Sequence, residues 1–204
     1  MFNLKSYNDS TPTSNWNTFY YYKNIFNDQM INKLTTDVTS NYDFSKGRTG
    51  VKALGTDTDS YKTNNRDIAY IGLDPNFKWL YDTLWPLVTQ ANDELFHFDI
   101  DIVTDPIHYV IYPTPTTPQT PDGGHLDWHM DTGSHATNKR KLAMTVQLSD
   151  PKDYDGGDFV FFGGRYKVTK KTGSAIVFPS NFCFPHAVTP VINGDRHAVI
   201  TWIR

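Results

Sequence analysis

Four residues from position 129 onward are of types that together could activate dioxygen: His129, Asp131, His186 and Arg196. Two imidazoles and one carboxylate can occupy one side of an Fe(II) ion and leave the other coordination positions open for dioxygen and a chelating cosubstrate. Arg196 lies ten residues beyond His186, and its planar fork can hold a carboxylate through two parallel hydrogen bonds. The set predicts an iron site that works with a carboxylate-bearing cosubstrate.

The His-x-Asp spacing occurs twice in this chain, once as His125 and Asp127 and once as His129 and Asp131. Residues two apart in an extended strand point to the same side, so the spacing allows either pair to bind a metal. The alternative for each pair is an ordinary polar contact on a loop. Spacing alone leaves the choice open.

The segment from His186 to Arg196 has the pattern of a β-hairpin, with an Asn-Gly pair at 193–194 as its turn. A two-residue loop would put His186 and Arg196 on opposite faces of the sheet. A three-residue loop over 192–194, with Gly194 at positive φ beside a bulge, puts both on one face, and we predict that loop. The alternative for Arg196 is a surface cation paired with Asp195.

The spacing of apolar residues changes once along the chain. It predicts amphipathic helices over 28–38, capped by Asn27 or Asp28, and over 75–95, where Pro86 should kink or split the helix. From Phe96 onward, short β-rich runs predict strands within 96–103, 107–113, 141–148, 158–162, 165–169, 174–179, 182–191 and 196–203. The pattern is typical of a sandwich or jelly roll with helices packed on one outer face, a mainly β chain of the α+β type.

Length and turn-rich segments suggest how the chain is organised. At 204 residues we expect a single domain, with helical support and lid segments in about 1–98 and a jelly-roll catalytic core in about 99–204. The segments 45–65 and 113–124 are polar or proline-rich, and both are long enough to be mobile covers. We predict that both border the metal.

Composition limits the partners and the compartment. The formal charge is -3, from 19 Lys+Arg and 22 Asp+Glu, without a basic run, so we expect no nucleic-acid partner. No apolar run approaches the roughly 20 residues that span a bilayer, so we expect no membrane partner. The single Cys183 and a start without a signal-peptide pattern predict a cytoplasmic protein. The Asn, Asp, Thr and Tyr content favours a viral, phage or low-GC bacterial source, and the oligomeric state stays open.

Several blocks of the chain, in order, resemble the 2-oxoglutarate and Fe(II)-dependent dioxygenases, most closely the prolyl 4-hydroxylase-like branch. The resemblance covers about residues 108–204, and the ordered set is more specific than any one block. The blocks are 111–113 (IYP), 128–131 (WHMD), 140–149 (RKLAMTVQLS), 154–159 (YDGGDF), 173–179 (GSAIVFP) and 186–196, followed by Trp202. The resemblance implies a double-stranded β-helix, which is a jelly roll.

The resemblance also implies roles for individual residues. It makes His129, Asp131 and His186 the iron ligands, in preference to the pair at 125 and 127. It makes Arg196 the partner of the distal carboxylate of 2-oxoglutarate.

Two further residues would contact the cosubstrate if the resemblance holds. Tyr112 matches a tyrosine that hydrogen-bonds 2-oxoglutarate. Gln147 stands where many prolyl hydroxylases carry a tyrosine, and we assign it as a cosubstrate contact too.

The implied activity is that of a 2-oxoglutarate-dependent dioxygenase. Its cofactors would be Fe(II), 2-oxoglutarate and O2, with ascorbate as an optional addition, and its co-products succinate and CO2. The retained carboxylate at Asp131 argues for hydroxylation over halogenation. A prolyl residue in a peptide or protein is the leading substrate, and a free amino acid or small metabolite is the alternative. A cupin-like metal-binding or carbohydrate-binding jelly roll is the alternative of another class.

Overall fold

The computed structural model describes residues 19–50, 61–72, 74–101, 105–117, 123–133 and 135–204. The described part is mainly β, and every strand pair in it is antiparallel, as the sequence predicts. The helices are α1 (Asp28–Asn41) and α2 (Lys78–Ala91), with short helical turns at Pro75–Phe77, Asn92–Phe96, His135–Lys139 and Phe162–Gly164. The strands are β1 (Tyr20–Tyr22), β2 (Ser45–Gly50), β3 (Tyr61–Ile71), β4 (Ile107–Tyr112), β5 (Leu126–His129), β6 (Leu142–Gln147), β7 (Asp155–Gly156), β8 (Phe159–Phe161), β9 (Tyr166–Lys167), β10 (Ala175–Pro179), β11 (His186–Val188), β12 (Val191–Asn193) and β13 (Arg196–Ile203).

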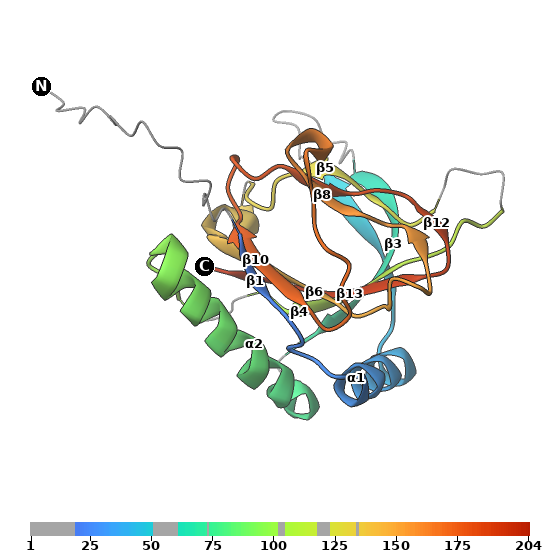
Figure 1. The fold of residues 1–204 in the computed structure, drawn as a ribbon, viewed down its shortest axis with the longest axis horizontal. Coiled ribbons are helices and arrows are strands. Elements are labelled where there is room, and N and C mark those ends of the chain that lie inside the picture. Colours follow the sequence, from blue (N-terminus) through green and yellow to red (C-terminus); the bar gives the residue numbers. More distant parts are fainter. Residues whose placement is uncertain (1–18, 51–60, 73, 102–104, 118–122, 134) are drawn as a thin grey trace, which may run out of the picture.

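Two sheets face each other across the molecule (Figure 1). The large sheet has seven strands in the order β1-β10-β6-β13-β4-β3-β2, and the small sheet has four in the order β5-β11-β8-β9. Strands β12 and β7 form a separate pair. Apolar side chains from the inner faces of both sheets meet in one buried cluster, which includes Val110 and Ile176 from the large sheet and Leu126 and Phe161 from the small one. The space between the sheets is therefore a packed apolar core. Positions that the apolar side chains do not occupy can carry functional groups.

The two helices lie on the outer side of the large sheet, away from the small sheet (Figure 1). Leu34 and Val38 of α1 and Leu84 and Val88 of α2 are buried in one cluster with Met144 and other residues of the large sheet. These positions follow the helical period that the sequence shows. Helix α1 begins after Asn27, whose side chain accepts a hydrogen bond from the backbone N–H of Met30.

Pro86 neither ends nor splits α2, so the predicted division of this helix is wrong. Proline removes the N–H that would bond the carbonyl four residues earlier, which belongs to Asp82. Both Pro86 and Asp82 are exposed, so water can satisfy that carbonyl. No helix in the described ranges is long and apolar enough to cross a bilayer.

Two sequence predictions about local structure need correction. The run 96–103 forms no strand over 97–101, and 102–104 lie outside the described residues. Apolar residues alternate in this run because Phe96, Phe98 and Ile100 pack against the core between the helices and the large sheet. The described part of the run pairs with no strand. The predicted cover 45–65 contributes strands β2 and β3 at the edge of the large sheet, and its middle, 51–60, lies outside the described residues.

The predicted hairpin over 186–196 is also wrong. His186 lies in β11 of the small sheet, whereas Arg196 begins β13 of the large sheet. Between them β12 pairs with β7, so the chain crosses from one sheet to the other instead of turning back on itself. Gly194 does adopt a positive φ of 69°, as expected for the turn. The consequence is that the two side chains can approach a common interior from opposite sheets.

Candidate metal centre and cosubstrate pocket

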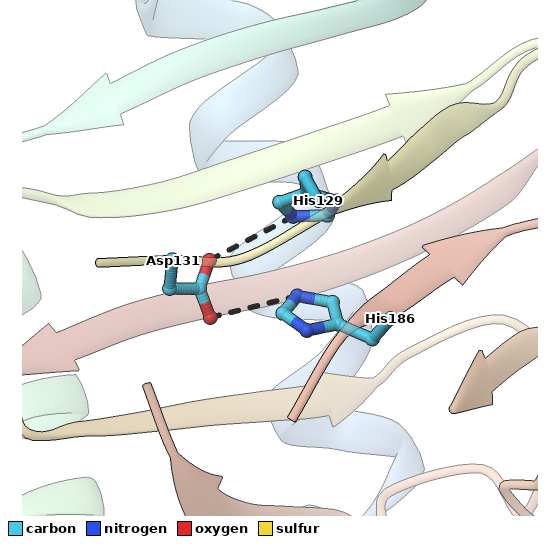
Figure 2. Close-up of side chains that lie close together, drawn as sticks. All are labelled: His129, Asp131 and His186. Carbon is cyan, nitrogen blue, oxygen red and sulfur yellow. Dashed lines mark ion pairs between the residues drawn. The ribbon is translucent and has the colours of Figure 1, made fainter. Parts of the chain in front are cut away.

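His129, Asp131 and His186 come together at one end of the space between the sheets. One nitrogen or oxygen atom from each side chain lies within 4.8 Å of the others. The Asp131 carboxylate faces both imidazoles, with Oδ1 3.7 Å from Nε2 of His129 and Oδ2 3.5 Å from Nε2 of His186 (Figure 2). Among the described residues this is the only group of at least three metal-binding side chains.

Neighbouring strands of the small sheet position the two histidines. His129 ends β5, His186 begins β11, and the two are register partners in the antiparallel pair. Their ring centroids are 4.2 Å apart. Asp131 follows just beyond β5, where the backbone N–H of Thr132 donates to the carbonyl of Ser180 at 2.9 Å. This bond ties the segment that carries Asp131 to the chain that leads into β11.

Backbone carbonyls fix the orientation of both imidazoles. Nδ1 of His129 lies 2.8 Å from the carbonyl of Asp127, and Nδ1 of His186 lies 2.9 Å from that of Phe184. A carbonyl oxygen only accepts, so each Nδ1 carries the proton and donates. In the neutral imidazole each Nε2 then carries a lone pair that faces Asp131, which is the form a metal requires.

Burial keeps His129 neutral. Loss of solvent, with a smaller contribution from the neighbouring His186, lowers the pKa of His129 to about 4. A neutral imidazole is the metal-binding form, so protons compete with a metal here only well below neutral pH.

The second His-x-Asp pair lies elsewhere. Asp127 is exposed, and Nδ1 of His125 is bonded to the carbonyl of Gly123 at 2.8 Å. Neither belongs to the metal-binding group. The backbone carbonyl of Asp127 nevertheless contributes by holding His129.

Arg196 lies in the buried interior on the opposite sheet. Only 2% of the residue is exposed, and its Nε donates to Oε1 of Gln147 at 3.2 Å. The guanidinium carbon stands 4.9 Å from the centre of the Tyr112 ring, so Tyr112 supports the flat face of the fork. Nη1 is buried and has no hydrogen-bond partner among the described residues. Arg196 is therefore not a surface cation paired with Asp195.

A small cavity adjoins Arg196. Its lining includes Gln147, Thr145, Lys170 and Phe159. The ring centroid of Phe159 lies 5.5 Å from that of His186, which links the cavity to the metal-binding group. The predicted cosubstrate contacts Tyr112 and Gln147 are thus both next to Arg196.

These residues fit a divalent metal and a carboxylate ligand. Two imidazole lone pairs and a carboxylate are the donor set of a facial iron site. Oδ2 of Asp131 is buried without a hydrogen-bond partner, as is Nη1 of Arg196. Buried polar atoms are seldom left unpaired, and a metal at the first atom and an anion at the second would satisfy both.

Residues 109–204 match the family model described as the 2OG-Fe(II) oxygenase superfamily. These residues contain the histidines, the aspartate and the arginine described above. The match covers just under half of the chain. It confirms the resemblance found in the sequence over these residues, and that resemblance implies the predicted Fe(II), 2-oxoglutarate and O2 as cofactors.

Curated relatives of this chain are similar over part of their length. A PKHD-type hydroxylase of Maricaulis maris is 35% identical over 85 residues, which are 41% of this chain and 38% of the relative. A PKHD-type hydroxylase of Alteromonas mediterranea is 46% identical over 65 residues, 31% of this chain and 28% of the relative. The matched part of the chain thus spans well under half the length of either protein.

Solved structures share this fold over most of the chain. A Trichoplax adhaerens prolyl hydroxylase, in complex with a peptide fragment of the hypoxia inducible factor oxygen degradation domain, has a TM-score of 0.69 at 21% identity and covers 93% of this chain and 84% of that one. A Pseudomonas putida prolyl-4-hydroxylase has a TM-score of 0.63 at 17% identity, with 92% of each chain covered. At these identities the likeness establishes the fold.

Sequence reasoning missed two side chains that support the candidate site. Arg140 donates from Nη1 to the backbone carbonyl of Asp131 at 3.3 Å, while its Nε bonds Asp105 at 2.6 Å. Tyr154 lies with its hydroxyl 3.1 Å from Nε2 of Gln147. Both residues stand in blocks that carry the family resemblance, which was the available signal. Their contacts depend on the fold.

Proposed function

We propose that the chain is a 2-oxoglutarate- and Fe(II)-dependent dioxygenase that hydroxylates an unactivated C–H bond, with a prolyl residue of a peptide or protein as the preferred substrate. Succinate and CO2 are the co-products. Bound Fe(II), with 2-oxoglutarate and O2, supplies the oxidising chemistry. We also propose that residues 1–204 act as one catalytic domain with a double-stranded β-helix core.

One observation supports this function most strongly. The metal-binding group on the small sheet and the buried arginine fork on the large sheet both border the interior that contains the cavity. A metal-binding jelly roll without 2-oxoglutarate turnover would have no use for a buried guanidinium whose Nη1 has no partner among the described residues. The cupin-like and carbohydrate-binding alternatives are therefore not favoured.

Each site residue has a definite task in this proposal. His129, Asp131 and His186 hold the metal, and the backbone carbonyls behind the imidazoles keep their lone pairs directed at it. Arg196 binds the distal carboxylate of 2-oxoglutarate, and Tyr112 lies against both Arg196 and the cosubstrate. The apolar wall that includes Phe159 excludes water from the reacting atoms.

Exposed apolar side chains around the metal-binding group favour a peptide substrate. Trp128, Met130 and Phe182 have exposed fractions of 49%, 48% and 78%. The first two flank His129, and Phe182 lies two residues beyond Ser180, which is bonded to Thr132. Flat aromatic surfaces suit a prolyl ring, and one structural relative was solved with a peptide bound.

The decisive experiment incubates the protein with Fe(II), 2-oxoglutarate, O2 and a proline-rich peptide library. Mass spectrometry should detect peptides that gain one oxygen atom, with succinate formed in equal amount. The His186→Ala variant is the matched negative control.

Two other outcomes would change the proposal. Succinate formation without any modified peptide would favour hydroxylation of a free amino acid or small metabolite. Absence of 2-oxoglutarate turnover with every substrate class would overturn the dioxygenase assignment.

A further inference from the structure

Arg66 is a buried cation without a counter-ion among the described residues. It lies in β3, and only 8% of the residue is exposed. Its Nε has no hydrogen-bond partner, and its guanidinium takes part in none of the ion pairs or cation–π contacts of the described residues. An unpaired charge is costly to bury, so a protein seldom keeps one unless a ligand neutralises it.

The side chain of Arg66 faces the space between the two sheets. Residues two apart in a strand share a face, and Ile68 belongs to the inner core together with Leu126 of the small sheet. Asp67 takes the opposite face, where it pairs with Lys46 of β2 at 2.7 Å. The carboxylate next to Arg66 in the sequence is therefore turned away from it.

Arg66 lies on the metal side of this space. Its strand contacts β5 of the small sheet, where the backbone N–H of His125 donates to the carbonyl of Asn65 at 3.2 Å (Figure 1). Strand β5 ends at His129, and the positive charge of Arg66 contributes to the low pKa of that histidine. The same charge acts on His108 in the adjacent strand β4. Arg66 therefore borders the approach to the metal-binding group.

The neighbouring strand makes room for the Arg66 side chain. Gly47 of β2 is buried, and a Cβ there would lie 2.5 Å from both Cγ and Nε of Arg66. The register of β2 against β3 also shifts between Lys46 and Arg48, which places Gly47 at an irregularity of the strand pair. Any larger residue at 47 would push the guanidinium out of its observed position.

The proposed metal site and cosubstrate do not supply the missing anion. Asp131, the carboxylate of the metal-binding group, faces the two imidazoles. 2-Oxoglutarate has two carboxylates, of which the distal one is assigned to Arg196 and the other chelates the metal with the keto oxygen. Arg196 and Arg66 also lie on different strands, with β4 between them. A further anion close to the metal must therefore arrive with the molecule that is hydroxylated.

We propose that Arg66 binds a carboxylate of the substrate, and that this carboxylate determines which substrates are hydroxylated. A planar guanidinium suits a carboxylate, which it can hold through two parallel hydrogen bonds. The carboxylate belongs either to an acidic residue next to the target or to the target itself, as a free α-carboxylate. The proposal rests on the proposed function, since it assumes that a substrate other than 2-oxoglutarate approaches the metal.

The test measures binding without oxygen to protein loaded with Fe(II) and 2-oxoglutarate, using two pairs of probes. One pair is acetyl-Glu-Pro-Glu amide and acetyl-Gln-Pro-Gln amide, and the other is N-acetylproline and N-acetylprolinamide. The wild type should bind the charged member of one pair about 10-fold to 100-fold more tightly, because a charge-assisted pair forms away from bulk water. The pair that shows the preference identifies the source of the carboxylate. Equal affinities within both pairs would overturn the proposal.

Arg66→Gln should abolish the preference for the charged probe and leave the affinities for the uncharged probes and for 2-oxoglutarate unchanged. The matched control is Lys46→Gln, which removes a positive charge from the opposite face of the same strand pair. The control should keep the preference. A loss of 2-oxoglutarate affinity in Arg66→Gln, or a loss of the preference in Lys46→Gln as well, would contradict the proposal.

Gly47→Ala tests the position of the guanidinium without changing any charge. The added methyl group must displace the Arg66 side chain, so the preference for the charged probe should fall. An unchanged preference in this variant would show that the observed position of Arg66 does not matter for binding, against the proposal.

Urea unfolding of the ligand-free protein separates a binding role from a structural one. An unpaired buried cation adds no ion pair to stability, so Arg66→Met should unfold at the same or a higher urea concentration than the wild type. A large decrease would make Arg66 a structural residue and overturn the proposal. Failure of the proposed function is a separate result, namely that no substrate class supports succinate formation, and the binding measurements do not depend on it.

Discussion

The two sheets that enclose the site differ in how they present their functional side chains. On the small sheet His186 is buried, but 20% of the His129 side chain is exposed, and neighbouring Trp128 and Met130 are about half exposed. On the large sheet Arg196, Gln147 and Tyr112 are almost completely buried. The helices also support only the large sheet (Figure 1).

This difference separates two kinds of recognition. A cosubstrate that is the same in every turnover can be held by fixed, dry donors, where each hydrogen bond is strong. A macromolecular substrate needs an open approach to the metal, and the small sheet leaves one. We therefore expect changes around Arg196 on the large sheet to alter cosubstrate affinity and changes on the rim of the small sheet to alter substrate affinity.

The largest effect should come from the metal ligands. His129→Ala, Asp131→Ala and His186→Ala should each lower activity by about 100-fold or more, since loss of one of three ligands disrupts metal binding. The matched controls His125→Ala and Asp127→Ala should keep most of it, because the Asp127 contact to His129 uses the backbone. Fe(II) titration checks this, and equal losses at 125 and 129 would reject the assignment.

Arg196→Lys should have the next largest effect, confined to the large sheet. Lysine keeps the charge but loses the fork and the Nε bond to Gln147, so 2-oxoglutarate affinity should fall about 10-fold to 100-fold. Fe(II) affinity should survive. Calorimetric titration of both ligands separates the two outcomes. Collapse of metal binding would mean that Arg196 is structural.

A smaller effect is expected on the rim of the small sheet. Trp128→Ala should raise the KM for a peptide substrate about 5-fold to 10-fold, the loss of one partly exposed aromatic contact. The 2-oxoglutarate affinity should not change. Phe182→Ala, with the same readout, is the companion variant. If either change altered the 2-oxoglutarate affinity but not the KM for the peptide, the expected difference between the two sheets would be wrong.

The last prediction concerns the pH dependence of stability and should leave both ligand affinities unchanged. Burial, with Arg66 and Arg140 nearby, lowers the pKa of His108 to about 3, below the usual 6.5. Between about pH 3 and pH 6.5 the unfolded chain therefore binds a proton at His108 and the folded chain does not. The free energy of unfolding consequently falls as the pH drops below about 6.5. The slope from His108 is at most about 1.4 kcal/mol per pH unit. Urea unfolding of His108→Phe between pH 4 and 7 should show a shallower slope than the wild type.

The clustering of His129, Asp131 and His186 could be predicted from the sequence because their order and spacing match a family pattern, and their role as iron ligands stays a proposal. Helix α1 and its Asn27 cap, and most strands after residue 105, were also predictable, since each depends on a local pattern. Strands β2 and β3 were not recognised, because their polar residues lack the alternation of a half-buried strand.

The errors share a physical cause, which is that a local pattern does not tell which sheet a strand joins. The Asn-Gly turn at 193–194 suggested that β11 and β13 pair, whereas they belong to different sheets. Tyr154 and Arg140 support the site through contacts that no local pattern predicts, since Tyr154 bonds the Gln147 side chain and Arg140 bonds the backbone carbonyl of Asp131. The predicted cover 113–124 has its ends joined by a bond between Gly124 and Pro113, and 118–122 lie outside the described residues.

The pairing of β5 with β11 has a mechanical consequence. β5 is the outermost strand of the small sheet, and its register partner across from His129 is His186. An ion bound by both side chains would cross-link these strands and close the intervening chain into a loop, much as a disulfide does. Loading the metal should therefore slow amide hydrogen exchange in β5 more than in β4, which lies between two strands of the large sheet.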